Sequence, residues 1–385
     1  AWNRPASLAR LLRSIEAADY GVAPASIELR FALDAAGNAT VDDEIEALVR
    51  GMRWPHGAVR VRRRTAHVGL RANVLGAWTP ADEDDPPPAV FLEDDVQVSK
   101  LWWHWVQASL RAYATEAAVQ HQLVGVSLFT PDDLNEPYEN GGDYDANGKF
   151  VPSCGWQARH LKSRAPGAAS AVLFGQPCSW GALYFPWHWA AFRQFAARLR
   201  HLPSNQLPMV PCPPGAKRNN WGHCKVSANH WGRNSWKRLM IYYMSMEGLF
   251  MLYPNLPSRA AFSTNHVEPG VHLAKNPHVL SGQRARHLMP LIDANTCARL
   301  RLHCSADAAA GLPVADEVPF SLPAVDAIGL YDFYCAAQSA VSEGGPAALK
   351  AAGEALRSKL PFDFFDSPPA ADDPSDDGSE YLVFT

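Results

Sequence analysis

The stretch AVFLEDDVQVS (residues 89–99) passes from an apolar strand to three adjacent carboxylates within a few positions. Glu93, Asp94 and Asp95 repel one another, and the end of a buried strand is a costly place for them. Ligands of open α/β sheets bind beyond the carboxyl ends of the strands. Mg²⁺ or Mn²⁺ takes one or two carboxylates at such a place, together with substrate phosphates. The stretch therefore predicts a divalent-cation site. The alternative is a solvated acidic loop, which is how we interpret ADEDDPPP (81–88).

Strands and helices are predicted to alternate along the chain on both sides of this stretch. Apolar residues recur either at helical spacing or in strand-like alternation. The predicted helices and strands cover, in turn, residues 4–20, 27–34, 42–52, 58–64, 67–78, 88–95, 99–117 and 123–129. Alternation at this pace predicts an α/β fold, with a mainly parallel sheet flanked by helices.

The second half of the chain is less regular. Residues 131–170 are rich in Asp, Asn, Gly and Pro, which predicts a long surface excursion. Strands are expected at 170–175 and 181–185, and helices at 186–200, 236–252 and 346–360. The acidic, Pro-rich residues 366–385 are predicted to be a disordered tail.

Composition narrows the classes of function. The chain has 385 residues, 47% of them apolar, and a net charge of −4, which is ordinary for a globular protein and argues against a nucleic-acid partner. The most apolar window, residues 239–253, is shorter than a bilayer span and contains Glu247, so we expect a buried helix there and any membrane anchor outside this chain. Seven scattered cysteines without a C-x-x-C pair exclude a zinc ribbon.

Several segments in this order resemble the GT-A family of nucleotide-sugar glycosyltransferases. They are NRPASLARLLRSI, the strand that ends at Asp34, HVGLRANVLGAW and VFLEDDVQVS with its aromatic helix. FLEDDVQVSKLWWHW is similar to the acidic motif of N-acetylglucosaminyltransferase-I-like and related family-2-like enzymes, and SWGALYFPWHWAAF to the glycine-bearing strand on their acceptor side. The resemblance implies a Rossmann-like GT-A catalytic domain over 1–275, a helical or irregular extension over 276–365 and the tail after it.

The resemblance also implies roles for individual residues. Asp95 would bind the metal, and Asp94 would face the ribose or the metal-bound waters, with Glu93 beside them. A late histidine often completes the metal site in this family, and His266 or His272 would fill that position. The other residues expected at the donor are Asn3, Arg4, Asp34, Arg71, Asn73 and Gly181.

The catalytic base is not evident from the sequence. An inverting transferase needs a carboxylate to take the proton of the acceptor hydroxyl. The family often places it after the glycine strand, where this chain reads GRNSWKRLMIYY without Asp or Glu. The substitutes are Asp132 and Asp133, after the strand LVGVSLF, together with Glu268 and Glu247. Glu247, inside the apolar helix, is more readily explained as a helix residue satisfied by a polar neighbour, and the stereochemistry stays open.

The expected function is transfer of a sugar from a nucleotide-sugar, expected to be a UDP-sugar, to a hydroxyl of a glycan or glycoprotein. The resemblance implies Mn²⁺ or Mg²⁺ as cofactor and the Golgi or secretory lumen as compartment, with the cytoplasm as alternative. A second candidate function is that of a nucleotidyltransferase, although AWNRPASLARLL lacks the glycines of the signature loop of those enzymes. A third is a non-catalytic sugar- or nucleotide-binding protein that lacks the base.

Overall fold

The structure is a computed structural model of the 385-residue chain. It describes residues 3–21, 26–35, 42–80, 86–114, 121–130, 142–144, 150–152, 170–202, 207, 235–256, 260–266, 268, 288–293, 295–296, 322–323, 328–331 and 381–384. All structural statements below concern these residues.

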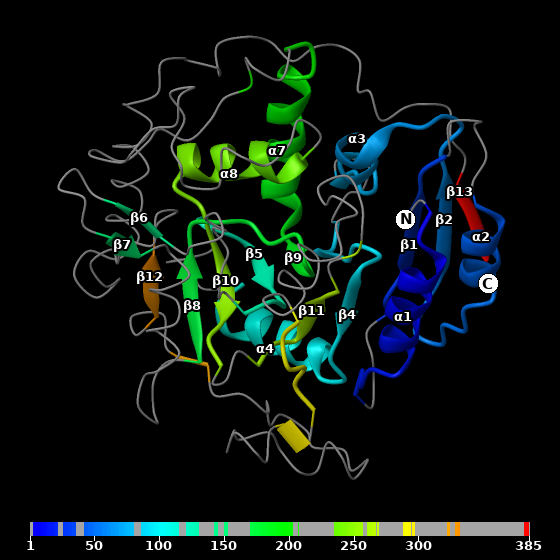
Figure 1. The fold of residues 1–385 in the computed structure, drawn as a ribbon, viewed down its shortest axis with the longest axis horizontal. Coiled ribbons are helices and arrows are strands. Elements are labelled where there is room, and N and C mark those ends of the chain that lie inside the picture. The colour runs from blue at the N-terminus through cyan, green and yellow to red at the C-terminus, as the bar shows by residue number, and fades with distance from the viewer. Residues whose placement is uncertain are drawn as a thin grey trace.

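The predicted α/β fold is confirmed, with mixed sheets flanked by helices (Figure 1). The helices are α1 (Pro5–Glu16), α2 (Asp43–Arg50), α3 (Gly69–Leu75), α4 (Trp102–Tyr113), α7 (Pro186–Arg198) and α8 (Trp236–Glu247). The strands are β1 (Leu29–Leu33), β2 (Val59–Arg63), β3 (Ala89–Phe91), β4 (Val96–Val98), β5 (Leu123–Ser127), β6 (Gly142–Tyr144), β7 (Phe150–Pro152), β8 (Ala171–Phe174), β9 (Ala182–Tyr184), β10 (Phe250–Pro254), β11 (Ser263–Asn265), β12 (Gly329–Tyr331) and β13 (Tyr381–Phe384).

The largest sheet has six strands in the order β12-β8-β10-β5-β9-β3. Its β10–β5 and β12–β8 pairs are parallel, whereas β10–β8, β5–β9 and β9–β3 are antiparallel. The prediction of a mainly parallel sheet is therefore wrong. The periodicity of apolar residues shows that a segment is a buried strand, but it does not carry the direction of that strand.

Both faces of this sheet are covered. Side chains alternate along each strand, so that Val172 and Phe174 of β8 pack with α7 and α8, while Ala171 and Leu173 pack on the side of α1 and α4. Trp105 of α4 is fully buried there and stacks on Phe262 with ring centroids 5.0 Å apart. The two apolar layers hold the strand ends that carry the candidate site.

A separate sheet has the order β1-β2-β13. β1 and β2 are parallel and in register, and β13 adds antiparallel to β2 with Tyr381 opposite Arg62. Tyr381–Phe384 lie in the tail that the sequence predicts to be disordered, and for these four residues that prediction is wrong, because YLVF is an apolar strand-forming end of an otherwise acidic segment. Residues 366–380 lie outside the described residues.

The apolar segment predicted as one helix over 236–252 is a helix followed by a strand. Gly248 has φ 63°, a left-handed conformation that ends α8 and that glycine adopts without strain. The chain then continues as β10 between β5 and β8. The prediction is wrong after Glu247, because apolar residues all round give the same pattern in a buried helix and a buried strand.

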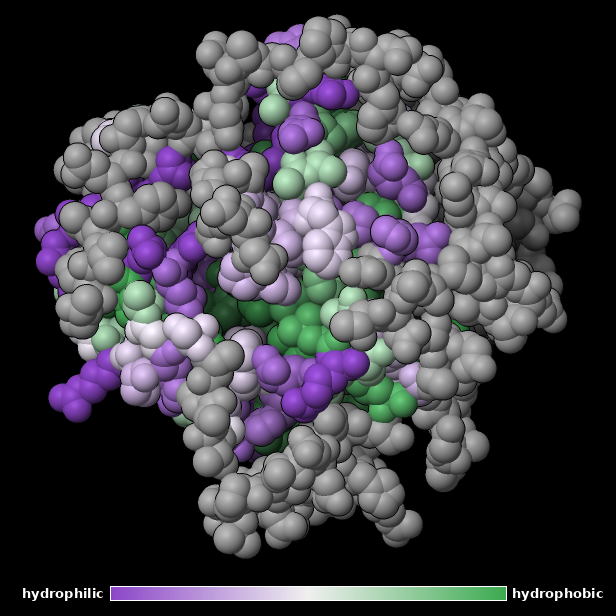
Figure 2. Space-filling model, turned by 180° about the vertical axis from the view of Figure 1, so that it is seen from behind, coloured by the Kyte–Doolittle hydropathy of each residue, from purple (hydrophilic) through white to green (hydrophobic). Residues whose placement is uncertain are grey.

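Two strand pairs lie outside these sheets, β4 with β11 and β6 with β7, both antiparallel. None of the described helices is both long and apolar enough to cross a bilayer. On the face behind that of Figure 1, apolar side chains lie in a hollow near the centre, bordered by strongly polar ones (Figure 2).

Candidate functional site

The site is built around the acidic turn, by which we mean Glu93, Asp94 and Asp95. β3 ends at Phe91 and β4 begins at Val96, so the turn joins the carboxyl end of one strand to the next strand. The amide N–H of Val96 donates to the carbonyl oxygen of Glu93 (3.1 Å), which closes the turn. Asp94 and Asp95 are 8% and 9% exposed, so their carboxylates are not part of a solvated loop.

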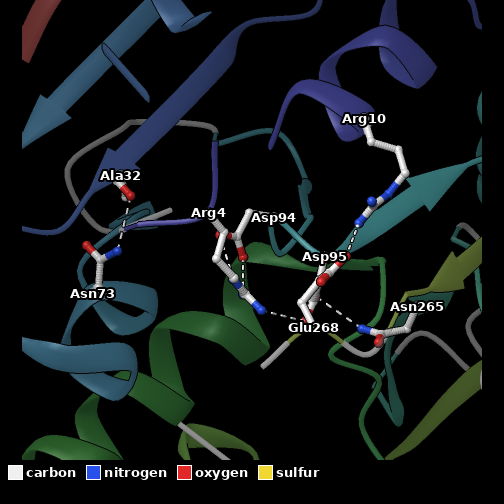
Figure 3. Close-up of polar contacts among 8 residues, drawn as sticks. All are labelled: Arg4, Arg10, Ala32, Asn73, Asp94, Asp95, Asn265 and Glu268. Atoms are coloured by element: carbon white, nitrogen blue, oxygen red, sulfur yellow. Dashed lines mark hydrogen bonds and ion pairs between the residues drawn. The ribbon is translucent and has the colours of Figure 1, made fainter. Parts of the chain in front are cut away.

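Arg4 neutralises part of this charge. It precedes α1, which packs against β4. Its Nε donates to Asp94 Oδ2 (3.1 Å), its Nη2 donates to Asp94 Oδ1, and its Nη1 donates to Asp95 Oδ2 (3.2 Å) (Figure 3). Burial alone would lower the pKa of Arg4, but the charges of Asp94 and Asp95 raise it above its ordinary value. The structure therefore brings together three of the residues predicted at the donor and metal.

The β4–β11 pair supplies a second set of contacts to Asp95. Asn265 lies opposite Val96 in this pair, and its Nδ2 donates to Asp95 Oδ1 (3.1 Å). The amide N–H of His266 donates to the backbone oxygen of Asp95 (2.9 Å). The imidazole Nε2 of His266 lies 2.8 Å from Gln97 Oε1. His266, predicted as a metal ligand, thus touches Asp95 through its backbone.

Glu268 lies next to this group. Its carboxylate pairs with Arg10 Nη2 of α1 at 3.0 Å (Figure 3), and Glu268 follows two residues after His266, whose backbone contacts Asp95. Of the four carboxylates considered as the base, Glu268 and Glu247 are among the described residues, and Glu247 is the last residue of α8. Asp132, Asp133 and the predicted metal ligand His272 lie outside them.

Glu93 differs from its two neighbours. The indole N–H of Trp236, the first residue of α8, donates to its carboxylate. Burial, followed by the charges of Asp95 and Asp94, raises the pKa of Glu93 to about 8, although Arg4 and the Trp236 hydrogen bond oppose the shift. Burial, against the charge of Arg4, also raises the pKa of Asp95. The acidic turn carries more negative charge than Arg4 offsets.

Asp34 has local partners. Its Oδ1 accepts from the amides of Ala35 (3.0 Å) and Val68 (2.9 Å), and its Oδ2 accepts from Gly69 (2.9 Å). His67 Nδ1 lies 3.1 Å from Oδ2. Asp34, which the sequence predicts to contact the nucleotide-sugar donor, therefore holds the start of α3 against the end of β1.

Two other predicted donor residues lie on α3. Asn73 donates from Nδ2 to the carbonyl oxygen of Ala32 (3.1 Å, Figure 3) and accepts from Arg64 Nε (3.2 Å), so both ends of its amide are used. Arg71 is half-buried and faces α8. Asn3, at the start of the described chain, is exposed.

Gly181 immediately precedes β9, at the end of the sheet where β3 leads into the acidic turn. Its φ is 96°, and a Cβ here would lie 3.2 Å from the Ser263 side chain and 3.3 Å from Leu128 Cδ1. Its carbonyl oxygen accepts from the amide of Leu128 (2.9 Å). The tight contacts of this predicted donor residue include one with the protein's own β11, at Ser263, two residues before Asn265.

Replacing Gly181 by alanine is expected to lower the free energy of unfolding by about 2–3 kcal/mol, from backbone strain and the tight Cβ contacts. Gly21 is the matched control, since its φ is 80° and a Cβ there meets nothing within 4 Å. Gly21→Ala should therefore show the strain alone, about 1 kcal/mol. Urea unfolding of both variants measures the difference; equal losses would mean that the contacts with Ser263 and Leu128 carry no cost.

The oxygen atoms that the acidic turn offers as metal ligands are compatible with Mn²⁺ or Mg²⁺. Among the described residues no group of three or more His, Cys, Asp or Glu side chains is arranged to hold a metal ion. These cations, however, bind through one or two carboxylates and take further oxygens from water and a diphosphate. Asp94 and Asp95 are hard oxygen donors, and the surplus negative charge of the acidic turn favours a cation. The residues present fit such an ion once a phosphate-bearing ligand accompanies it.

Asn265 and Trp236 are the site residues that the sequence does not single out. Asn265 is 170 positions from Asp95, and Trp236 reads as an ordinary apolar helix residue. A polar STN sequence at a buried strand is the one signal that points to Asn265. A scan of protein-family models and a search of curated protein sequences find no match to this chain.

Proposed function

We propose that this protein is a metal-dependent glycosyltransferase of GT-A fold that moves a sugar from a nucleotide-sugar, of the UDP class, to a hydroxyl of a glycan or glycoconjugate. The observation that carries the proposal is the acidic turn. Two nearly buried carboxylates lie side by side at the carboxyl end of β3, with more negative charge than Arg4 neutralises. An arrangement of this kind is costly unless a cation with its phosphate ligand completes it.

Asp95 and Asp94 would hold the cation. Bound there, the ion would stabilise the negative charge that develops on the departing diphosphate. Asn265 and Arg4 each hold one oxygen of Asp95, so the carboxylate is oriented before any ligand arrives. Such preorganisation lowers the cost of binding.

Glu268 is a candidate for the base that deprotonates the acceptor hydroxyl. Its carboxylate is held by Arg10, which fixes its direction, and Glu268 follows two residues after His266, whose backbone contacts Asp95. As the base it would accept the proton of the acceptor hydroxyl while that oxygen attacks the sugar. Asp132 and Asp133 remain candidates for the same role.

The test is nucleotide-sugar binding with and without Mn²⁺. UDP-sugars with Mn²⁺ should raise the melting temperature by several degrees, because a ligand at a hundred times its Kd adds about 2.7 kcal/mol. EDTA should abolish the rise, and sugar transfer to a glycan acceptor should follow. Binding without transfer would indicate a sugar- or nucleotide-binding protein, and pyrophosphate release from a nucleoside triphosphate with a sugar phosphate would indicate a nucleotidyltransferase. Absence of both binding and turnover in the presence of Mn²⁺ would contradict the proposal.

A further inference from the structure

Two arginines lie on α3 and α8, two helices that are in contact with each other. Arg71 lies on α3 and Arg238 in the first turn of α8, and these helices pack together at that turn (Figure 1). Both side chains are half-buried. Partial burial, followed by the charge of Arg71, lowers the pKa of Arg238. Two like charges are therefore held close enough to repel in a place that water only partly screens.

Neither arginine has a carboxylate partner among the described residues. Arg238 Nη2 donates to the carbonyl oxygen of Leu207 (3.0 Å), and its Nε is buried without a hydrogen-bond partner. Arg4 and Arg10, by contrast, pair with carboxylates, although the Nε of Arg10 is likewise buried without a hydrogen-bond partner. A buried donor without an acceptor costs free energy, so this pair is a local defect in the unliganded protein.

The sequence around Arg238 offers no counter-charge. Residues 146–246 contain 13 lysines and arginines and not one Asp or Glu, although the whole chain carries a net charge of −4. This 101-residue stretch, which includes α7 and α8, therefore contains no acidic residue that could pair with Arg238. The missing negative charge has to come from elsewhere in the chain or from a ligand.

We infer that Arg71 and Arg238 form a binding site for an oxyanion group, a phosphate, sulfate or carboxylate, held by two guanidinium groups from different helices. Guanidinium forks match the oxygens of such groups and bind them in pairs. The start of α8, which carries Arg238, lies near the acidic turn, because Trp236 is hydrogen-bonded to Glu93; Arg238 points to a different face of the helix from Trp236. Two sources share this chemistry: the diphosphate of a nucleotide-sugar, which rests on the proposed function, and an acidic group on the acceptor.

Titration with inorganic pyrophosphate in EDTA tests the site without metal or sugar. We expect Arg71→Gln and Arg238→Gln each to raise the Kd about tenfold, the value of one charge-assisted contact. Arg111→Gln, which removes an exposed arginine at the end of α4, is the control and should bind as wild type does. The melting temperature of the unliganded Arg71→Gln and Arg238→Gln variants should equal or exceed that of wild type, because the substitution removes repulsion.

Titrations with UDP and pyrophosphate distinguish the two sources of the oxyanion. If both variants weaken binding of UDP with Mn²⁺ but not of uridine, the oxyanion is the donor's diphosphate. If UDP binding is unchanged while pyrophosphate binding is weakened, the oxyanion belongs to the acceptor. Equal pyrophosphate affinity in all four proteins, or a lower melting temperature with unchanged affinity, would overturn the inference. Asp95→Asn should leave pyrophosphate binding in EDTA intact, so a failure of the proposed function is distinguishable from a failure of this site.

Discussion

Replacing Asp95 by asparagine is expected to weaken Mn²⁺-dependent binding of UDP-sugars by more than about 100-fold, since even partners of a metal ligand are worth 10–100-fold. Asp95 is nearly buried, and Asn265 and Arg4 hold its two oxygens in place. An amide of the same shape loses the negative charge that a divalent cation requires. Calorimetric titration of Mn²⁺ with UDP measures the effect, and sugar transfer should fall by a similar factor.

The substitution should not unfold the protein. Asp94 still pairs with Arg4 in the variant, and removing the charge of Asp95 relieves its repulsion with Asp94 and Glu93. Asp43→Asn makes the same change at an exposed position of α2 and should bind UDP with Mn²⁺ as wild type does. Affinity of Asp95→Asn within twofold of wild type would remove Asp95 from the proposed metal site.

The place of the acidic turn at a strand end could be predicted from the sequence, but the contacts of its side chains could not. The acidic turn follows an apolar strand, and that local pattern is enough to place three carboxylates at a strand end. The pairing of Arg4 with Asp94 joins residues 90 positions apart, and no periodicity records such a contact. Asp34 shows the same limit: its place at the end of β1 is predicted, whereas its use by the amides of Val68 and Gly69 depends on where α3 packs.

The order and direction of the strands could not be predicted from the sequence, for a related reason. β9 separates β5 from β3 and runs antiparallel to both, and β8 does not pair with β9 although only a short turn joins them. Adjacent apolar strands look alike whichever way they run. The antiparallel β9 matters for the site, because it places Gly181 at the same end of the sheet as the acidic turn, with Ala182 opposite Phe91.

Replacing Glu93 by glutamine is expected to change how stability depends on pH in the metal-free protein. The pKa of Glu93 is raised to about 8 in the folded state, from an ordinary value of 4.5. The stability of the wild type relative to the variant is therefore fully present below about pH 4.5 and is lost as the pH rises through about 8. At pH 8.5 the variant should be more stable than wild type by up to about 5 kcal/mol, since the pKa of Glu93 rises from 4.5 to about 8 and one pKa unit corresponds to about 1.4 kcal/mol. Urea unfolding in EDTA at several pH values measures the difference.

Glutamine keeps the oxygen that accepts from the Trp236 indole, so the comparison isolates the charge of Glu93. Glu44→Gln, at an exposed position of α2, should follow the wild-type pH profile within about 0.5 kcal/mol. Mn²⁺ with UDP should narrow the gap between Glu93→Gln and wild type at pH 8.5, because a cation offsets the repulsion among the three carboxylates. Parallel profiles for Glu93→Gln and wild type in EDTA would mean that the Glu93 carboxylate titrates as an ordinary one, and that burial and the charges of Asp94 and Asp95 do not destabilise its ionised form.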